Sequence, residues 1–585
     1  MLLKGGRTNE ALKLCEKLCA RSDADSASLS LLGEIYFHQG RFPEAAVVLQ
    51  RAIQLEPDNA AVCSMLADSS LHQGQTAKAA EYYRMALQQR PDDPKLLTNL
   101  AGILSGMHRS SEAEPLLRRA VQLAPHLSKP YTNLGSSLQA QGKVDEALEV
   151  YENGLKNADD DPQLHSNYLL ARHYSAIQDS KGSLVAHKAW GQRHACSRTP
   201  HRFKVSERCN TGKLRVGYIS PDFRTHSVPY FLMPLFENYD RDAFEVICYS
   251  DVYKQDSMTR RLQGQVDGWR NTVGFTDEKV DQRIRSDGID ILVDLAGHTA
   301  DNRLGVFARR SAPVQITWLG YPDTTGLDEM DYRISDGYAD PSGFEEYCSE
   351  QLLRLDKCFL CYGPPQDVPL PGCSPVGENG FLTFGSFNNL AKINNEVLRL
   401  WADVLKMVPG SRLVIKNPGL TDAATRQDYL SRIAAHGIDT ARITLKGLSS
   451  DTKSHLDEYG NIDIGLDTFP YNGTTTTCEA MWMGVPVLTL AGNVHASRVG
   501  SSLLQACNMD HWIAESPQQY IDLAVKYAFN SEDLASERHT LRERMAGSIL
   551  CDAKRFTGSM EEALLHAWHS WCRKEGEITD IGDEI

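Results

Sequence analysis

The apolar positions of the chain follow two different patterns, which change near residue 210. Up to about residue 160, apolar residues recur with the spacing of helices, and the whole pattern returns every 34 residues. After residue 210, short apolar runs alternate with helix-like stretches, which predicts strands and helices in turn. We therefore expect a helical repeat array followed by an α/β region.

Prolines and small residues at fixed positions carry the repeat. Pro57, Pro91 and Pro125 lie 34 residues apart, each after an apolar run. One alanine series keeps the same step, at Ala11, Ala45, Ala79, Ala113 and Ala147. The turn position holds Gly40, Gly74, His108 and Gly142. The pattern resembles the tetratricopeptide repeat, an α-solenoid in which antiparallel helices pack through small residues.

The predicted array covers residues 1–162. Solenoids of this kind hold extended peptides on their concave face, so protein or peptide partners are the first expectation. The alternative is that the array only spaces or dimerises the protein.

The back part is predicted to form two α/β lobes. Linker helices and a loop are expected over 163–212. Strands are predicted at 214–220, 244–250, 289–295, 314–319, 382–386, 412–416, 443–445, 462–467 and 486–490. A proline-rich passage divides them into lobes at 213–365 and 366–573. Because such parallel sheets bind ligands at the carboxyl ends of their strands, the cleft between the lobes is the expected site.

Composition narrows the class of protein. The 585 residues include 61 Lys plus Arg against 76 Asp plus Glu, and this net charge of -15 disfavours nucleic acid as a partner. The sequence shows neither an apolar run of 18 residues nor a signal-peptide pattern, so we expect a cytoplasmic protein without a membrane partner, or a nuclear one in a eukaryote. Neither lobe has a dinucleotide fingerprint or a P-loop. Residues 574–585 are predicted to be a disordered acidic tail.

Two histidines lie just beyond predicted strands of the first lobe, His226 after the first strand and His298 after the third. A histidine in such a place can act as a general base, because its pKa lies near the working pH. The alternative for each is a hydrogen-bonded structural role.

The first strand of the second lobe is followed by Asn388, Asn389 and Lys392. A lysine there could hold a diphosphate as a compact point charge, or it could be a solvated lysine at a helix start.

A threonine run is the most distinctive motif of the second lobe. Thr474, Thr475, Thr476 and Thr477 lie between a strand and an apolar helix. Hydroxyls and free N–H groups at a helix N-terminus can hold an anion, whereas capping alone needs one hydroxyl. Glu479 could accept hydrogen bonds from a ribose or be an ordinary first-turn glutamate. The turn at 492–500 is a second candidate for an anion.

No metal or other cofactor is expected. The acidic pair in Asp240-Arg241-Asp242 precedes a strand, and Cys358 and Cys361 lie in an apolar run without a second cysteine pair.

Together these segments are similar to the O-GlcNAc transferase and Spindly family. The resemblance rests on the repeats and on residues 219–227, 297–299, 318–322, 386–393 and 474–479. It implies a GT-B fold with two Rossmann-like lobes. It also implies a metal-independent, inverting glycosyltransferase that modifies Ser or Thr of intracellular proteins held along the repeats, through which the chain could also form a homodimer.

The resemblance implies roles for individual residues. Lys392 would stabilise the leaving diphosphate, together with the turn at 475–477. Glu479 matches a ribose-binding position, and His455 matches a histidine that contacts the base. The two histidines of the first lobe lie where relatives place candidate bases.

The identity of the donor stays open, and so do two alternative functions. Thr474 and Glu479 stand where animal O-GlcNAc enzymes carry His and Asp, and other stretches look closer to Spindly. Because Spindly members of plants use GDP-fucose, GDP-fucose is nearly equal to UDP-GlcNAc, which is placed first only as the commoner donor in the family. A non-catalytic repeat scaffold, or a sugar-nucleotide hydrolase or epimerase on the same fold, are the alternatives to a transferase.

Overall fold

The computed structural model describes residues 8–21, 23–195, 200–203, 212–365 and 368–582. Two compact units make up the chain: residues 1–164 with 421–425, and residues 165–420 with 426–585. Among the described helices, none combines the length and the apolar character needed to cross a membrane.

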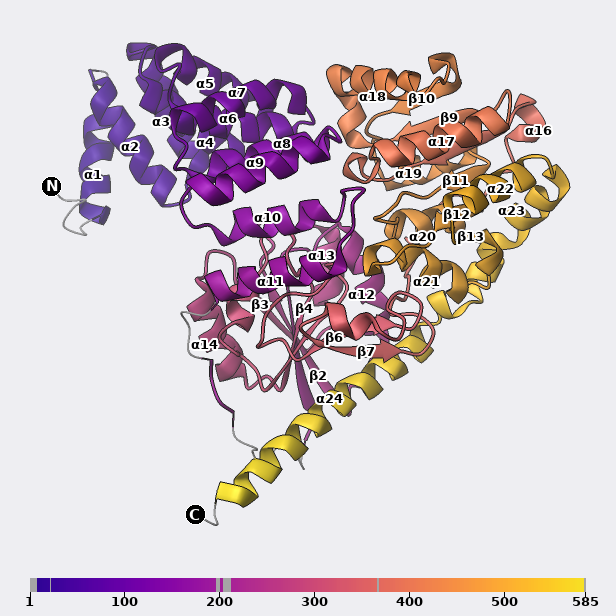
Figure 1. Cartoon of the computed structure of the whole chain (residues 1–585). Coiled ribbons are helices and arrows are strands. Elements are labelled where there is room, and N and C mark those ends of the chain that lie inside the picture. Colours follow the sequence, from indigo (N-terminus) through magenta and orange to yellow (C-terminus); the bar gives the residue numbers. More distant parts are fainter. Residues whose placement is uncertain (1–7, 22, 196–199, 204–211, 366–367, 583–585) are drawn as a thin grey trace. The chain divides into compact units, whose positions relative to one another are not determined.

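Antiparallel helix pairs build the first unit (Figure 1). The helices are α1 (Thr8–Cys19), α2 (Ser26–His38), α3 (Phe42–Leu55), α4 (Ala60–His72), α5 (Thr76–Gln89), α6 (Pro94–Gly106), α7 (Ser110–Leu123), α8 (Ser128–Ala140) and α9 (Val144–Asn157). α10 (Pro162–Arg172) runs from the end of this unit into the second. The predicted repeat array is confirmed.

Small residues explain how closely these helices pack. The side chains of Ala45, Ala79, Ala113 and Ala147 have no exposed surface. Each helix pair is joined by a left-handed residue, with φ of 73° at position 40, 74° at 74, 57° at 108 and 72° at 142. Glycine adopts this conformation readily, whereas His108 must hold it against the steric clash of its Cβ.

The second unit holds two parallel sheets. The first has the order β3-β2-β1-β4-β5-β6-β7, and the second the order β10-β9-β8-β11-β12-β13. The strands of the first are β1 (Leu214–Ser220), β2 (Phe244–Ser250), β3 (Gly268–Asn271), β4 (Ile291–Asp294), β5 (Val314–Thr317), β6 (Tyr332–Asp336) and β7 (Gln351–Leu355). Those of the second are β8 (Thr383–Ser386), β9 (Arg412–Lys416), β10 (Ile443–Lys446), β11 (Ile464–Leu466), β12 (Val487–Leu490) and β13 (Ile513–Ala514).

Helices accompany both sheets, and the two-lobed α/β fold is confirmed. Those of the first lobe are α11 (Ser180–His194), α12 (Ser227–Asn238), α13 (Ser257–Gln263), α14 (Asp277–Asp287) and α15 (Leu304–Phe307). Those that follow are α16 (Val376–Asn379), α17 (Asn395–Met407), α18 (Ala423–Ala435), α19 (Thr452–Asp457), α20 (Thr475–Trp482), α21 (Val499–Ala506), α22 (Pro517–Ala528), α23 (Ser531–Ala546) and α24 (Ala553–Gly582).

The last helix returns to the first lobe. α24 packs on α12 and β7, and the ring of its Phe556 stacks on Trp318 with 6.0 Å between centroids. The prediction of a disordered acidic tail at 574–585 is corrected here, because α24 stays helical as far as Gly582. Glutamate and lysine are good helix formers, so the tail composition allows the helix to continue.

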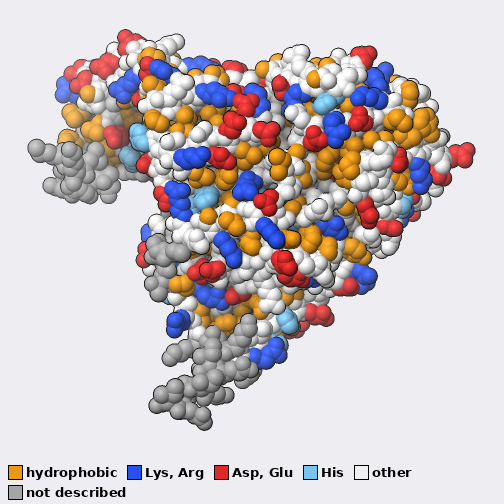
Figure 2. Space-filling model, in the orientation of Figure 1, with side chains coloured by type: hydrophobic (Ala, Val, Ile, Leu, Met, Phe, Trp, Pro, Cys, Tyr) orange, Lys and Arg blue, Asp and Glu red, His pale blue; other side chains and the backbone are white. Residues whose placement is uncertain are grey.

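Charged side chains are dispersed over the face of the molecule drawn in Figure 2. Lys and Arg alternate there with Asp and Glu, and the described residues of this face form no extended basic surface.

Candidate functional site

The loop between β11 and α20 forms the predicted cradle. Asp467 directly follows β11 and is buried, and its Oδ1 accepts hydrogen bonds from the backbone N–H groups of Gly473 at 2.7 Å and Thr468 at 2.8 Å. The hydroxyl of Thr489 bonds its other oxygen. Burial raises the pKa of Asp467 to about 6. Asp467 therefore holds the loop that leads into α20.

The N-terminus of α20 keeps its donors available. Thr474 precedes the helix, and its side chain makes no capping hydrogen bond. Thr474, Thr475 and Thr476 are half-buried, whereas Thr477 is buried. A helix N-terminus with uncapped N–H groups and neighbouring hydroxyls suits a diphosphate.

Lys392 reaches the same loop from β8. It ends the short helix η3 (Leu390–Lys392), and its Nζ donates to the carbonyl oxygen of Asn472 at 2.7 Å. The ammonium also lies 3.9 Å from the centre of the Tyr471 ring. Burial lowers the pKa of Lys392 to about 8, against the opposing effect of Asp467. The fold thus brings two motifs about 80 residues apart in the sequence together.

The two predicted asparagines differ in their surroundings. Asn388 is buried, its Nδ2 donates to Ser386 at 3.3 Å, and its Oδ1 has no hydrogen-bond partner among the described residues. The side chain of Asn389 is exposed and caps η3 by accepting from the N–H of Ala391 at 3.1 Å. Asn388 therefore keeps an acceptor available, whereas Asn389 stabilises the turn that presents Lys392.

A second cluster surrounds Glu479. The Nε2 of His455 lies 3.2 Å from the Oε2 of Glu479, and the hydroxyl of Tyr459 donates to the same oxygen at 3.4 Å. On the other side of the ring, the Nζ of Lys416 lies 2.6 Å from the Nδ1 of His455. Phe387 packs on Tyr459, with 4.3 Å between ring centroids.

Sequence reasoning missed Lys416, Tyr459 and Phe387. Lys416 ends a predicted strand and Phe387 directly follows one, which was the available signal. Tyr459 lies in the short helix η6 (Glu458–Asn461), and its sequence context gives no indication of its partner.

His226 lies at the carboxyl end of β1, as predicted. It is the N-cap of α12, where its Nδ1 accepts from the N–H of Val228 at 3.4 Å, and it lies 3.7 Å from Asp222. About 39% of the side chain is exposed. Burial of the remainder lowers its pKa, so the imidazole is neutral near pH 7 and able to take a proton.

The structure buries His298, the other predicted base. Its side chain has no exposed surface, and it packs on Trp190 with 4.9 Å between ring centroids. Nε2 lies 2.8 Å from the carbonyl oxygen of Thr325, which can only accept, so Nε2 carries the proton. Nδ1 then accepts from Ser166 at 3.0 Å. The ring thus bonds to α10 through Ser166 and packs on α11 through Trp190, and the sequence pattern does not reveal these contacts.

A cleft lies between the two lobes. It has a volume of about 520 Å³ and is lined by Thr225, Tyr230 and Arg261 from the first lobe and by Thr452 and Lys453 from α19. Thr225 adjoins His226, and α19 carries His455. The candidate site residues themselves are not among the residues that line this cleft.

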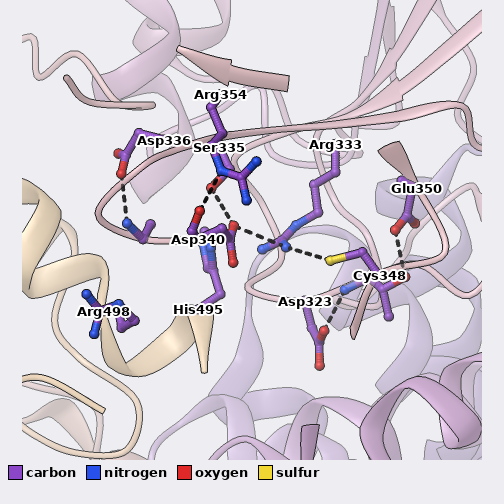
Figure 3. Close-up of polar contacts among 12 residues, drawn as sticks. Asp323, Arg333, Ser335, Asp336, Asp340, Cys348, Glu350, Arg354, His495 and Arg498 are labelled. Atoms are coloured by element: carbon purple, nitrogen blue, oxygen red, sulfur yellow. Dashed lines mark hydrogen bonds and ion pairs between the residues drawn. The ribbon is translucent and has the colours of Figure 1, made fainter. Parts of the chain in front are cut away.

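The turn at 492–500, predicted as a second anion site, joins the lobes instead. The Nδ1–H of His495 donates to the carboxylate of Asp340 in the first lobe at 2.7 Å, and Arg498 donates to the carbonyl oxygen of Tyr338 at 2.8 Å. Figure 3 shows Arg333 on the other side of Asp340, at 3.4 Å. The basic groups of this turn are thus occupied by partners in the first lobe.

One group of side chains in the described residues has metal-like spacing. The ligand atoms of His173, His187 and Asp323 lie within 4.8 Å of one another. The hydroxyl of Tyr321 contacts both imidazoles, at 3.0 and 2.8 Å. Hydrogen bonds therefore connect this cluster, in which His173 follows α10, His187 lies in α11 and Asp323 follows β5. Cys358 and Cys361 are core residues, 2% and 0% exposed.

Comparisons with known proteins agree with this geometry. The model of glycosyl transferase family 41 matches residues 163–364 and 377–560, and a tetratricopeptide repeat model matches residues 2–69, 37–103 and 106–172. The Arabidopsis thaliana protein named probable UDP-N-acetylglucosamine–peptide N-acetylglucosaminyltransferase SPINDLY is 42% identical over 424 residues, covering 71% of this chain and 46% of the relative. The similarly named SEC protein of the same plant is 30% identical, over 62% of this chain and 38% of the relative.

A solved structure extends the similarity to the whole chain. A lysine-to-methionine mutant of the Thermobaculum terrenum O-GlcNAc transferase superposes with a TM-score of 0.79 and 33% identity, covering 97% of this chain and 99% of the other. The chain spans about half the length of the curated relatives it matches. Its two lobes, its repeats and these matches place it in a single family: the chain belongs to glycosyl transferase family 41.

Proposed function

We propose that this protein is an inverting O-glycosyltransferase that moves one sugar from a nucleotide sugar to Ser or Thr of intracellular proteins. One observation carries the proposal: the contact of Lys392 with Asn472 brings a positive charge to the loop that leads into the uncapped N-terminus of α20. The names of the relatives, which are peptide N-acetylglucosaminyltransferases, support the same class of reaction.

The proposed reaction is a direct displacement. The acceptor hydroxyl attacks the anomeric carbon, the bond from that carbon to the diphosphate oxygen breaks, and the configuration inverts. Lys392 and the N–H groups and hydroxyls at 474–477 stabilise the negative charge that develops on the diphosphate. The proton of the hydroxyl passes to a base, for which His226 is the candidate because it is exposed and neutral.

The reaction is proposed to proceed without a metal ion, because Lys392 and α20 supply the positive charge that a metal would otherwise bring to the diphosphate. Turnover measured in EDTA is expected to equal turnover in untreated buffer. Loss of activity in EDTA that Mg²⁺ or Mn²⁺ restores would contradict this part of the proposal.

The nucleoside is proposed to lie at Glu479 and His455, with UDP-GlcNAc as the donor and GDP-fucose as the alternative. The names of the relatives favour UDP-GlcNAc. Thermal melting with UDP, GDP, UDP-GlcNAc and GDP-fucose separates the two, since a ligand at 100 times its dissociation constant adds about 2.7 kcal/mol to stability.

Acceptor proteins are proposed to bind along the repeats, whose concave surface suits extended chains. The test is mass spectrometry of a protein acceptor after incubation with the donor. Sugar on Ser or Thr supports the transferase, free sugar in its place indicates a hydrolase, and an unchanged donor leaves the scaffold hypothesis.

A further inference from the structure

Lys416 lies where the donor site meets the interior of the second lobe. It ends β9 and is 3% exposed, and its Nζ lies 5.2 Å from the centre of the Phe387 ring. Burial lowers the pKa of this amine, whereas the nearby carboxylates Glu458 and Glu479 favour its charged form. The ammonium is the form that these two carboxylates stabilise, and its Nζ lies 2.6 Å from the Nδ1 of His455.

The chemistry of this contact fixes the position of a proton. An ammonium group has three N–H donors and no acceptor, so the Nδ1 of His455 must accept and carry no proton. A neutral imidazole then has its one proton on Nε2, which lies 3.2 Å from the Oε2 of Glu479. Lys416, His455 and Glu479 thus form a chain in which each hydrogen bond has one direction.

The other forms of the ring are excluded by the same contact. An imidazolium, or the tautomer with its proton on Nδ1, would place an N–H against the ammonium at 2.6 Å. The remaining charged and titratable groups near the ring leave this arrangement intact. Tyr459 donates to Glu479, and Lys446 is paired with Glu458.

We propose that Lys416 is a positioning residue that holds His455 as the neutral tautomer protonated at Nε2, so that the nucleotide meets a fixed N–H donor beside the carboxylate of Glu479. The assignment of the nucleotide to this place rests on the proposed function. The state of the ring does not, because it follows from contacts of the unliganded protein.

A fixed N–H donor beside a carboxylate determines which ligand atoms can bind there. A nucleoside must offer an acceptor to the Nε2–H of His455 and hydroxyl donors to Glu479. The wrong tautomer would turn a lone pair toward the same ligand atom, and an imidazolium would hold Glu479 in an ion pair. Lys416 therefore acts on donor affinity without touching the reacting atoms.

The test measures the protonation of His455 in the full-length protein. Histidine labelled with ¹⁵N reports which ring nitrogen carries the proton, and the signals are assigned by their loss in His455→Asn. At pH 7 we expect a single form of His455 protonated at Nε2 in the wild type, and a second form that carries a proton on Nδ1 in Lys416→Met. Lys416→Arg, which can also only donate, is expected to restore the wild-type behaviour.

Nucleotide binding provides the second readout. The dissociation constant of UDP or GDP, whichever binds the wild type, is expected to rise about tenfold in Lys416→Met at pH 7, as for one lost hydrogen bond. Lys446→Met is the matched control, because it removes a nearby charge that contacts Glu458 and not His455.

The outcomes separate the two proposals. A proton on Nδ1 of wild-type His455, or no difference between Lys416→Met and the wild type, overturns the role of Lys416. If His455 is held in one form but neither UDP nor GDP binds, the positioning of the ring stands, while its use for a nucleotide and the proposed function both fail.

Discussion

Lys392 must be positively charged for the proposed reaction, but its burial disfavours the charged form. Burial lowers its pKa to about 8, so the free protein carries the charge below that pH and loses it above. Because kcat/KM reports groups of the free enzyme, we expect it to fall about tenfold per pH unit above 8. A profile from pH 6 to 9.5 tests this, and Lys392→Arg is expected to lose the alkaline fall. A rate that stays level to pH 9.5 would contradict the role of this ammonium.

Removal of the side chain gives a second prediction at this site. Lys392→Ala is expected to lower kcat about 100- to 1,000-fold, the usual cost of deleting one group that stabilises developing negative charge. Its melting temperature is expected to stay at or above that of the wild type, since a buried amine is costly to desolvate. The matched control is Lys406→Ala, at an exposed lysine paired with Asp403. Activity retained in Lys392→Ala would remove the residue from the mechanism.

At the level of residues, the sequence predicted those site residues that come just after a parallel strand. Lys392, Glu479 and the threonines lie together because the carboxyl ends of parallel strands meet at one edge of a sheet. His298 also follows a strand, but α10 and α11 bury it, and burial by a distant segment has no local signature. The contact between Lys416 and His455 could not be predicted for the same reason, because the two residues are 39 positions apart in the sequence.

Among the elements, the repeat helices followed their sequence pattern most closely. A helix pair has a long periodic signal, whereas the strands that were not predicted, β3, β6, β7 and β13, are short and lie at a sheet edge or next to one. The turn at position 108, between the two helices of one repeat, shows that the repeat keeps its backbone conformation even where the glycine is replaced. His108 keeps φ at 57°, close to the values of the glycines at the equivalent turns.

This turn allows a prediction about stability. His108→Gly is expected to raise the free energy of unfolding of the repeat unit by about 1 kcal/mol, because glycine adopts the left-handed conformation without the clash of a Cβ. Gly142→Ala, at the equivalent turn, is the reciprocal control and is expected to destabilise the unit by a similar amount. Denaturant unfolding of both variants measures the change. A His108→Gly protein less stable than the wild type would show that the histidine side chain makes contacts worth more than the strain.

The whole molecule contains separate cores. A cluster around Leu29, Leu49 and Leu66 stabilises the front of the repeat unit, and the large cluster that includes Trp318, Trp401 and Trp512 belongs to the α/β unit. Within that second unit, His495 and Asp340 join the lobes, and α24 runs from the second lobe to α12 of the first. The two lobes are therefore expected to unfold together, and the repeats by themselves.

Calorimetry of the full chain tests this division together with the donor site. The groups proposed to bind the nucleotide, including Lys392 and Glu479, all lie in the α/β unit, so a nucleotide can stabilise only the transition of that unit directly. We expect two transitions, of which UDP or GDP at 100 times its dissociation constant stabilises one by about 2.7 kcal/mol and leaves the other unchanged. Glu479→Ala is expected to reduce that shift because it removes an acceptor for ribose hydroxyls. A single transition that moves as a whole would mean that the repeats and the lobes unfold as one unit, and two transitions that both stay in place with every nucleotide would contradict the proposed donor site.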